Sequence, residues 1–275
     1  MGSVHLTVSD LDRSLDYYRR EIGLEMLERS PGRASLGAGK RELLALYEAT
    51  GARPAPGATG LYHFALLVPS RADLAGWLAH AARDRVRLDG MSDHFVSEAI
   101  YLSDPDDHGI EIYADRPREV WEGKVASRLT SLPLDVESLL SELGDPADAR
   151  FEGLPAGTVM GHIHLRVADL SRTVAFYRDV LGFALMAQLG GSAAFLSAGG
   201  YHHHIGANTW ESAGGSPPPP GSAALRHATI VLDGAPERDR ILTRLPDPTS
   251  VELTEFGPTI RDPSGNALVL AVDPL

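Results

Sequence analysis

The feature that most constrains the fold of this chain is an internal repeat. Residues 4–24 (VHLTVSDLDRSLDYYRREIGL) align without a gap with residues 163–183 (IHLRVADLSRTVAFYRDVLGF). Each copy begins with the alternation typical of a strand and continues with apolar residues at helical spacing. Asp10 and Asp169 stand where a helix N-cap is expected. The match indicates that the chain contains a duplication.

A weaker repeat lies within each half. Residues 61–69 (LYHFALLVP) and 225–233 (LRHATIVLD) each precede a helical pattern, and both halves end on an Asp-Pro turn between strands. The sequence therefore predicts an α+β fold of four βαβββ modules whose strands form two curved mixed sheets. The modules are expected at about residues 1–50, 60–115, 161–212 and 223–272. The predicted division is an N-terminal domain over 1–115, a connector over 116–160 with a short helix around 135–143, and a C-terminal domain over 161–275.

Histidines on the opening strands are the first candidate functional residues. We assign one histidine to the same place in each module: His5, His63, His164 and His227. A single histidine in an apolar alternation is more often a core residue with a satisfied hydrogen bond. Four of them in a repeat indicate a shared role, although duplication alone could preserve a structural histidine.

A carboxylate in a final strand strengthens this interpretation. Glu111 lies between Ile110 and Ile112 in an alternating pattern that directs it toward the core. A carboxylate in that position is costly unless it is paired or bound to a metal. Two histidines and one carboxylate, with positions left open, form the ligand set of non-haem Fe(II) oxygenases.

Residues 93–111 (DHFVSEAIYLSDPDDHGIE) resemble the signature of extradiol ring-cleaving dioxygenases. The residues that fit are His94, Ile100, Tyr101, Asp104, Pro105 and Glu111, whereas Ser92 and Asp107 depart from the signature at turn positions. These enzymes belong, with glyoxalase I and bleomycin-resistance proteins, to the vicinal oxygen chelate superfamily. The resemblance covers nearly the whole chain and is closest to two-domain bacterial catechol dioxygenases of the Bacillus type. It implies that the four modules form two vicinal oxygen chelate domains.

The resemblance also implies roles for individual residues. It makes His63 and Glu111 metal ligands, and it makes Tyr101 and His94 partners of a substrate hydroxyl. It further implies a catalytic histidine on a late strand of the module that supplies the third ligand.

Residues 201–208 (YHHHIGAN) match that late strand, with His204 at the best-aligned position and His203 beside it. Because this tract lies in the late part of module three, we predict that modules two and three pair and that His164 is the third ligand. A pairing of modules one and two would instead make His5 the third ligand.

The predicted function is that of a metal-dependent extradiol dioxygenase, a catechol 2,3-type enzyme that uses Fe(II), or Mn(II) in its place. Its partners would be O2 and a small aromatic substrate, catechol or a substituted catechol. The first alternative is a glyoxalase-type metal-dependent isomerase or lyase, which usually needs a second carboxylate ligand. The second is a non-enzymatic protein that binds a small-molecule drug. We expect Phe95, Asn208 and Trp210 to line the pocket.

Composition excludes several other classes. The net charge of −12 and the pI near 5.3 argue against nucleic acid and anionic membranes as partners. Cysteine is absent, so thiolate ligands and Cys nucleophiles are excluded. Neither a signal peptide nor an apolar run long enough to span a bilayer is visible, so we expect a cytoplasmic protein. Assembly into a homo-oligomer is left open.

Overall fold

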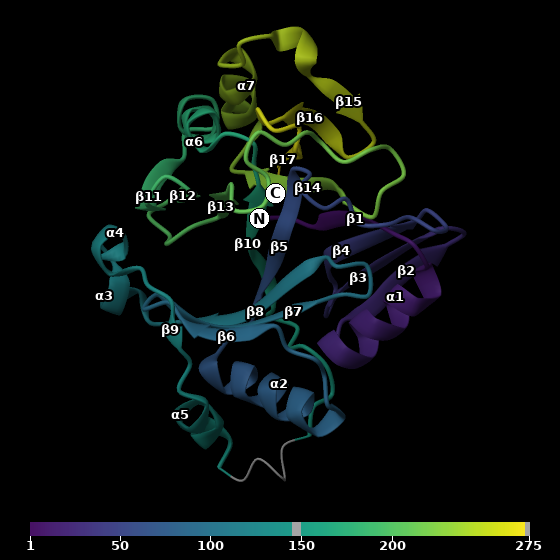
Figure 1. Ribbon diagram of the computed structural model, residues 1–275, viewed down its shortest axis with the longest axis vertical. Helices are drawn as coiled ribbons and strands as arrows, with labels where there is room; N and C mark the ends of the chain where they lie inside the picture. The colour runs from purple at the N-terminus through teal and green to yellow at the C-terminus, as the bar shows by residue number, and fades with distance from the viewer. Residues whose placement is uncertain (145–149, 273–275) are drawn as a thin grey trace.

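The computed structural model describes residues 1–144 and 150–272 and confirms the predicted α+β fold. Two curved mixed sheets are built from four module-sized groups of strands, and the helices lie on the outside of the sheets (Figure 1). Within these residues, no helix is long and apolar enough to cross a membrane.

The first sheet combines modules one and four. Its eight strands have the order β15-β16-β17-β14-β1-β4-β3-β2. Their bounds are β1 (Val4–Val8), β2 (Glu25–Ser30), β3 (Arg33–Ala38), β4 (Arg41–Glu48), β14 (Leu225–Leu232), β15 (Glu252–Thr254), β16 (Gly257–Arg261) and β17 (Ala267–Val272). The antiparallel pairing of β1 with β14 joins the two modules.

The second sheet combines modules two and three. Its nine strands have the order β11-β12-β13-β10-β5-β8-β7-β6-β9. Their bounds are β5 (Gly60–Leu67), β6 (Gly90–Asp93), β7 (Ser97–Ser103), β8 (Gly109–Asp115), β9 (Leu132–Pro133), β10 (Val159–Arg166), β11 (Ala184–Leu189), β12 (Ala193–Ser197) and β13 (Ile205–Asn208). The antiparallel pairing of β5 with β10 confirms the predicted partnership of modules two and three. Each sheet therefore takes one module from each half of the sequence.

A helix follows each of the four opening strands, as the repeat predicts, and further short helices lie in the connector. The α-helices are α1 (Leu11–Tyr17), α2 (Arg71–Asp84), α3 (Arg118–Trp121), α4 (Val125–Arg128), α5 (Val136–Leu140), α6 (Leu170–Asp179) and α7 (Ala235–Thr243). A π-helix, η1 (Tyr18–Ile22), continues α1, and η2 (Ser141–Leu143) and η3 (Pro248–Ser250) are 3-10 helices. Asp10 and Asp169 cap α1 and α6 by accepting hydrogen bonds from backbone N–H groups. The predicted connector helix is found as α5 and η2, while connector residues 145–149 lie outside the described part of the chain.

A buried tyrosine–aspartate hydrogen bond links the two modules within each half. The Tyr18 hydroxyl donates to Asp104 at 2.8 Å, and the equivalent Tyr177 hydroxyl donates to Asp262 at 3.3 Å. Each aspartate opens an Asp-Pro turn and also accepts two backbone N–H groups of that turn. Each of these links connects a module of the first sheet with a module of the second sheet. Side-chain hydrogen bonds therefore link the two modules within each half, and strand pairing within each sheet joins one half to the other.

We predict that Tyr18→Phe lowers the free energy of unfolding by about 1–3 kcal/mol, because it leaves a buried carboxylate one donor short. Chemical denaturation monitored by circular dichroism measures the change. The matched control is Tyr17→Phe, since the Tyr17 hydroxyl donates to the carbonyl of Ser103 at an exposed position. Equal losses for the two variants would show that the Tyr18–Asp104 bond has no special role.

Candidate active site

Two histidine nitrogens and one carboxylate oxygen, all of which can bind a metal ion, lie close together on one side of the second sheet. The Nε2 atom of His63 lies 3.0 Å from Oε2 of Glu111, the Nε2 atom of His162 lies 3.1 Å from the same oxygen, and the two nitrogens are 3.4 Å apart. Two ligands that each lie about 2.1 Å from an ion, at right angles to each other, would be about 3.0 Å apart. The triangle therefore has the size that three ligands of one divalent cation need, and its two nitrogens and one oxygen are a suitable donor set.

The register of three strands explains why these side chains meet. Ala65 on β5 lies opposite His162 on β10 on one side and opposite Glu111 on β8 on the other. The small alanine side chain lets the two larger groups meet above it. His63 is two residues from Ala65 and shares its face of the strand. All three ligand-type side chains thus project from adjacent strands to one side of the sheet.

Electrostatics favour an ionised carboxylate here. Burial by itself would raise the pKa of Glu111, but the contacts with His162 and His63 hold it well below its usual value. Burial lowers the pKa of His162, which keeps its ring neutral despite the opposing effect of Glu111. A carboxylate anion and a neutral imidazole are the forms that bind a metal ion.

We did not single out His162 from the sequence. Counting the residues between each strand histidine and the next helix N-cap would have identified it. His63 stands seven residues before the N-cap Ser70, and His162 stands seven residues before the N-cap Asp169. His164 stands only five residues before Asp169. The assignment of the four strand histidines to one equivalent place is therefore wrong. The gapless match of residues 4–24 with 163–183 concealed this, because module one has Ser3 where module three has His162.

His164, the predicted third ligand, lies beside the triangle. It is the cross-strand partner of His63, and the centroids of the two rings are 5.0 Å apart. Within the described chain, its Nε2 atom is buried and has no hydrogen-bond partner. Burial lowers its pKa well below the usual histidine value, so the ring is neutral. In the described part of the chain, the ligand-type atoms that all lie within 4.8 Å of one another belong to His63, Glu111 and His162.

The alternative ligand His5 lies in the other sheet. Its ring packs 3.9 Å from that of His227 across the β1–β14 pairing, and its Nδ1 contacts the Tyr47 hydroxyl at 3.0 Å. The same sheet has Ala45 and Val269 at the places that correspond to Glu111. This face of the first sheet therefore has two strand histidines, His5 and His227, but no carboxylate at a position that corresponds to Glu111.

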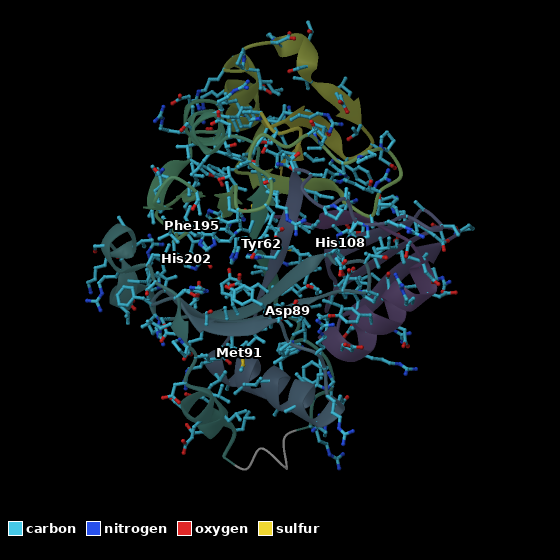
Figure 2. The ribbon with its side chains drawn as sticks, viewed as in Figure 1. Tyr62, Asp89, Met91, His108, Phe195 and His202 are labelled. Atoms are coloured by element: carbon cyan, nitrogen blue, oxygen red, sulfur yellow. The ribbon has the colours of Figure 1, made fainter. Side chains whose placement is uncertain are left out.

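A cavity of about 530 Å³ opens next to the triangle. His63 and Glu111 are part of its wall, while His162 is buried behind them with 1% of its surface exposed. Aromatic walls come from Tyr62, Phe195 and Trp210, of which only Trp210 was expected from the sequence. Figure 2 shows Phe195 and His202 between the strands of module three and the curved strands of module two. The cavity has the size and the mixed lining of a small-molecule site.

The predicted pair of Tyr101 and His94 lies in this cavity. Nδ1 of His94 donates to the carbonyl oxygen of Thr130 at 2.7 Å, so a neutral His94 has its lone pair on Nε2. That atom lies 2.7 Å from the Tyr101 hydroxyl and can accept its proton in a hydrogen bond. Burial and the neighbouring Glu111 charge raise the pKa of Tyr101 well above its usual value. Tyr101 therefore stays protonated, and its oxygen can accept a hydrogen bond from a ligand.

The histidine tract is not part of a strand, because β13 begins only at Ile205. Gly199 and Gly200 precede the tract in the left-handed backbone conformation, which turns the chain before the histidines. His203 lines the cavity, with its ring centroid 4.1 Å from that of His162. His204 instead contacts Ser197 at 3.0 Å and faces a different surface recess beside Phe183. The two candidates for the catalytic histidine are thus on opposite sides of the loop.

A chain of hydrogen bonds extends from His203 to the surface. Nδ1 of His203 lies 2.8 Å from Nδ1 of His202, and Nε2 of His202 lies 2.9 Å from Oδ1 of Asp115. The carboxylate can only accept, so His202 donates from Nε2, and a neutral His202 ring then has its lone pair on Nδ1. His203 then donates from Nδ1 and keeps its own lone pair on Nε2. Burial lowers the pKa of His203 well below its usual value, which is consistent with this neutral form.

Comparisons with known proteins agree with this geometry. The family model described as the Glyoxalase/Bleomycin resistance protein/Dioxygenase superfamily matches residues 1–112 and 159–270. The chain belongs to this superfamily. A Bacillus subtilis (strain 168) protein named Catechol-2,3-dioxygenase is 43% identical over 281 residues, which cover 99% of this chain and 96% of that protein.

Solved structures with low sequence identity show the same fold. A putative dioxygenase from Bacillus subtilis has a TM-score of 0.63 at 17% identity, with 100% of this chain and 86% of the other covered. Glyoxalase I from Zea mays has a TM-score of 0.61 at 16% identity, with 98% and 91% covered. Both descriptions fall within the superfamily, whose members differ in chemistry, so the site has to decide the reaction.

Proposed function

We propose that this superfamily member is an extradiol dioxygenase that cleaves the ring of a catechol with O2. The observation that carries the proposal is the triangle of His63, His162 and Glu111 beside a cavity that also holds Tyr101 and His203. The 43% identical relative named Catechol-2,3-dioxygenase supports the same activity. Catechol or a substituted catechol would be the substrate, and O2 the second reactant.

The proposed ligands are His63, His162 and Glu111. We favour His162 over His164, since only His162 contacts Glu111 in the metal-sized triangle. Two histidines and one carboxylate with open positions suit Fe(II), with Mn(II) as the alternative. When bound, the ion supplies electron transfer with O2 and a positive charge that favours ionisation of a catechol hydroxyl.

Tyr101 and His94 would orient the substrate. The Tyr101 proton is directed to Nε2 of His94, so the tyrosine oxygen is free to accept a hydrogen bond from one catechol hydroxyl. His94 is fixed in turn by the backbone of Thr130. This arrangement would hold the ring in one orientation.

His203 would be the acid–base group. Its lone pair on Nε2 can take the proton of a catechol hydroxyl and return it later in the cycle. His202 and Asp115 would fix this tautomer and share the positive charge that forms on His203. His204 contacts Ser197 away from the cavity, so we assign it no direct role.

The two alternative functions fit the site less well. A glyoxalase-type reaction that needs a second carboxylate would require one on β13, but Gly206 occupies the place that corresponds to Glu111. A side-chain Cβ at Gly206 would lie only 2.8 Å from the ring of His164, so this position leaves no room for a carboxylate. A drug-binding protein would not need the buried triangle, whose polar groups are costly to assemble.

The first prediction concerns activity. Purified protein reconstituted with Fe(II) is expected to consume one equivalent of O2 per catechol and to form the yellow product of extradiol cleavage. An oxygen electrode and absorbance spectroscopy measure both. Metal binding without oxygen uptake for any catechol would exclude the dioxygenase and favour another metal-dependent reaction.

The second prediction identifies the third ligand. His162→Ala and Glu111→Gln are expected to lose at least tenfold in metal affinity, because the first removes one nitrogen donor of the triangle and the second removes the negative charge that offsets the cation. Calorimetric titration of metal-free protein with Mn(II) measures this without turnover. His5→Ala, in the other sheet, is the control and is expected to bind normally. Normal binding by His162→Ala together with loss of binding by His164→Ala would make His164 the ligand.

The third prediction concerns the tautomer of His203. His202→Phe keeps a ring but removes the acceptor for Nδ1–H, so the proton of His203 is expected to move to Nε2 and kcat to fall with little change in KM. Nitrogen-15 spectra of histidine-labelled, metal-free protein report the tautomer. His202→Asn retains an amide oxygen near the Nδ1 position and is expected to restore part of both properties. An unchanged spectrum in His202→Phe would refute the role of His202.

A further inference from the structure

Three polar side chains on the neighbouring strands β10 and β13, two of them in the cavity wall, have nitrogens without hydrogen-bond partners. They are Nε2 of His164, Nε of Arg166 and Nδ2 of Asn208, each inaccessible to solvent within the described chain. His164 and Arg166 line the cavity. Unpartnered buried nitrogens of this kind are costly, and a cluster of them calls for an explanation such as a missing ligand.

Strand register brings the three together. Arg166 on β10 is the direct partner of Asn208 on β13, and His164 is the partner of Gly206. Gly206 leaves the space that the His164 ring occupies. The side-chain oxygen of Asn208 accepts the backbone N–H of Trp210 at 3.2 Å, which assigns the orientation of the amide. Its NH2 group is therefore the free end of that side chain.

Acceptor atoms of a ligand would suit the Asn208 amide, and also Arg166, whose guanidinium is already ion-paired with Glu211 but has no aligned hydrogen bond at Nε. A guanidinium N–H and an amide NH2 can only donate, and the guanidinium also carries a positive charge. The chain's own carboxylate at Glu211, which is exposed, lies 3.3 Å from Nε of Arg166 without forming an aligned hydrogen bond. This contact shows that a carboxylate can reach the guanidinium. Arginine binds such groups in a bidentate manner when the geometry allows.

Aromatic rings frame the same end of the cavity. The Tyr62 ring lies 5.3 Å from that of Trp210 and 5.2 Å from that of His164, and the Arg166 guanidinium lies 5.6 Å from the centre of the Tyr62 ring. The charges on the cavity wall are also asymmetric. Asp89 and Asp107 come from module two, whereas Arg166 comes from module three. An anionic group on a ligand would therefore be directed toward module three.

We propose that Arg166, Asn208 and His164 form a subsite for a carboxylate carried on the aromatic ring of the substrate. The inference rests on the proposed dioxygenase function and narrows its substrate class from catechols in general to catechols with an anionic substituent. The cavity of about 530 Å³ is larger than an unsubstituted catechol ring requires. The substituent would replace Glu211 as the partner of Arg166.

The test compares two substrates of nearly the same shape, 3,4-dihydroxybenzoate and 3,4-dihydroxybenzamide. For the wild-type enzyme we expect kcat/KM to favour the carboxylate by about tenfold, which corresponds to about 1.4 kcal/mol. Arg166→Gln is expected to abolish this preference, and Glu211→Gln to increase it. Arg178→Gln is the matched control, because Arg178 also pairs with an exposed carboxylate but lies on α6. It is expected to leave the preference unchanged.

A second measurement separates the subsite from the chemistry. Metal-free protein is titrated with benzoate and with benzamide, and the fluorescence of Trp210, which lines the cavity, reports binding. Tighter binding of benzoate that is lost in Arg166→Gln supports the subsite even if no catechol is cleaved, a result that would overturn only the dioxygenase proposal. Cleavage of catechols with no preference for the carboxylate, and no effect of Arg166→Gln in either assay, would overturn the subsite alone.

Discussion

The antiparallel pairing of β5 with β10 is the contact on which the candidate site depends. It joins two modules that are separated in the sequence by the connector, and it places His162 two strands away from Glu111 with only Ala65 between them. Without this pairing, module two would have one histidine and one carboxylate, and module three would have a histidine pair without a carboxylate. The pairing of β1 with β14 repeats the arrangement in the first sheet, where no carboxylate corresponds to Glu111. One duplicated architecture thus yields one complete ligand set.

Small residues allow the close approach of the two modules. A Cβ at Gly161, next to His162, would lie 1.9 Å from the Tyr113 hydroxyl, which itself bonds to Tyr201 at 2.9 Å. Glu111, Tyr113 and Asp115 alternate along β8 and so share one face of the strand. That face supplies the carboxylate of the triangle, a contact to the histidine loop and the final acceptor of the His203–His202–Asp115 chain. One face of β8 therefore contributes both to the proposed metal site, through Glu111, and to the position of the proposed acid–base group, through Tyr113 and Asp115.

The sequence predicted the modules from repeats and alternation, and their pairing from the family resemblance and the position of the histidine tract. It predicted only part of the cavity wall, since Phe95 and Asn208, which were expected to line the cavity, are not among its lining residues. His63, Glu111, Tyr101 and His94 stand in short motifs with fixed spacing, and the structure brings all four together. His162 was missed because the longest repeat aligned His164 with His5. The distance in sequence from each strand histidine to the next helix cap, which groups His162 with His63, was not compared.

The loop at residues 199–204 could not be predicted by strand alternation. Its direction depends on two glycines with positive φ and on contacts with Asp115 and Tyr113, which are distant in the sequence. The chain of hydrogen bonds that fixes His203 and the unpartnered nitrogens of Arg166 and Asn208 likewise depend on which strands become neighbours. Side-chain partners of this kind are a property of the tertiary structure.

The central claim is that His63, His162 and Glu111 bind one metal ion while His164 remains free to face the substrate. Anomalous diffraction at the iron absorption edge, from crystals of the Fe(II)-loaded protein, tests it most directly. We expect a single strong peak about 2.0–2.2 Å from Nε2 of His63, Nε2 of His162 and a Glu111 oxygen, with His164 outside the coordination sphere. A peak bound by His164 in place of His162, or one in the first sheet between His5 and His227, would contradict it.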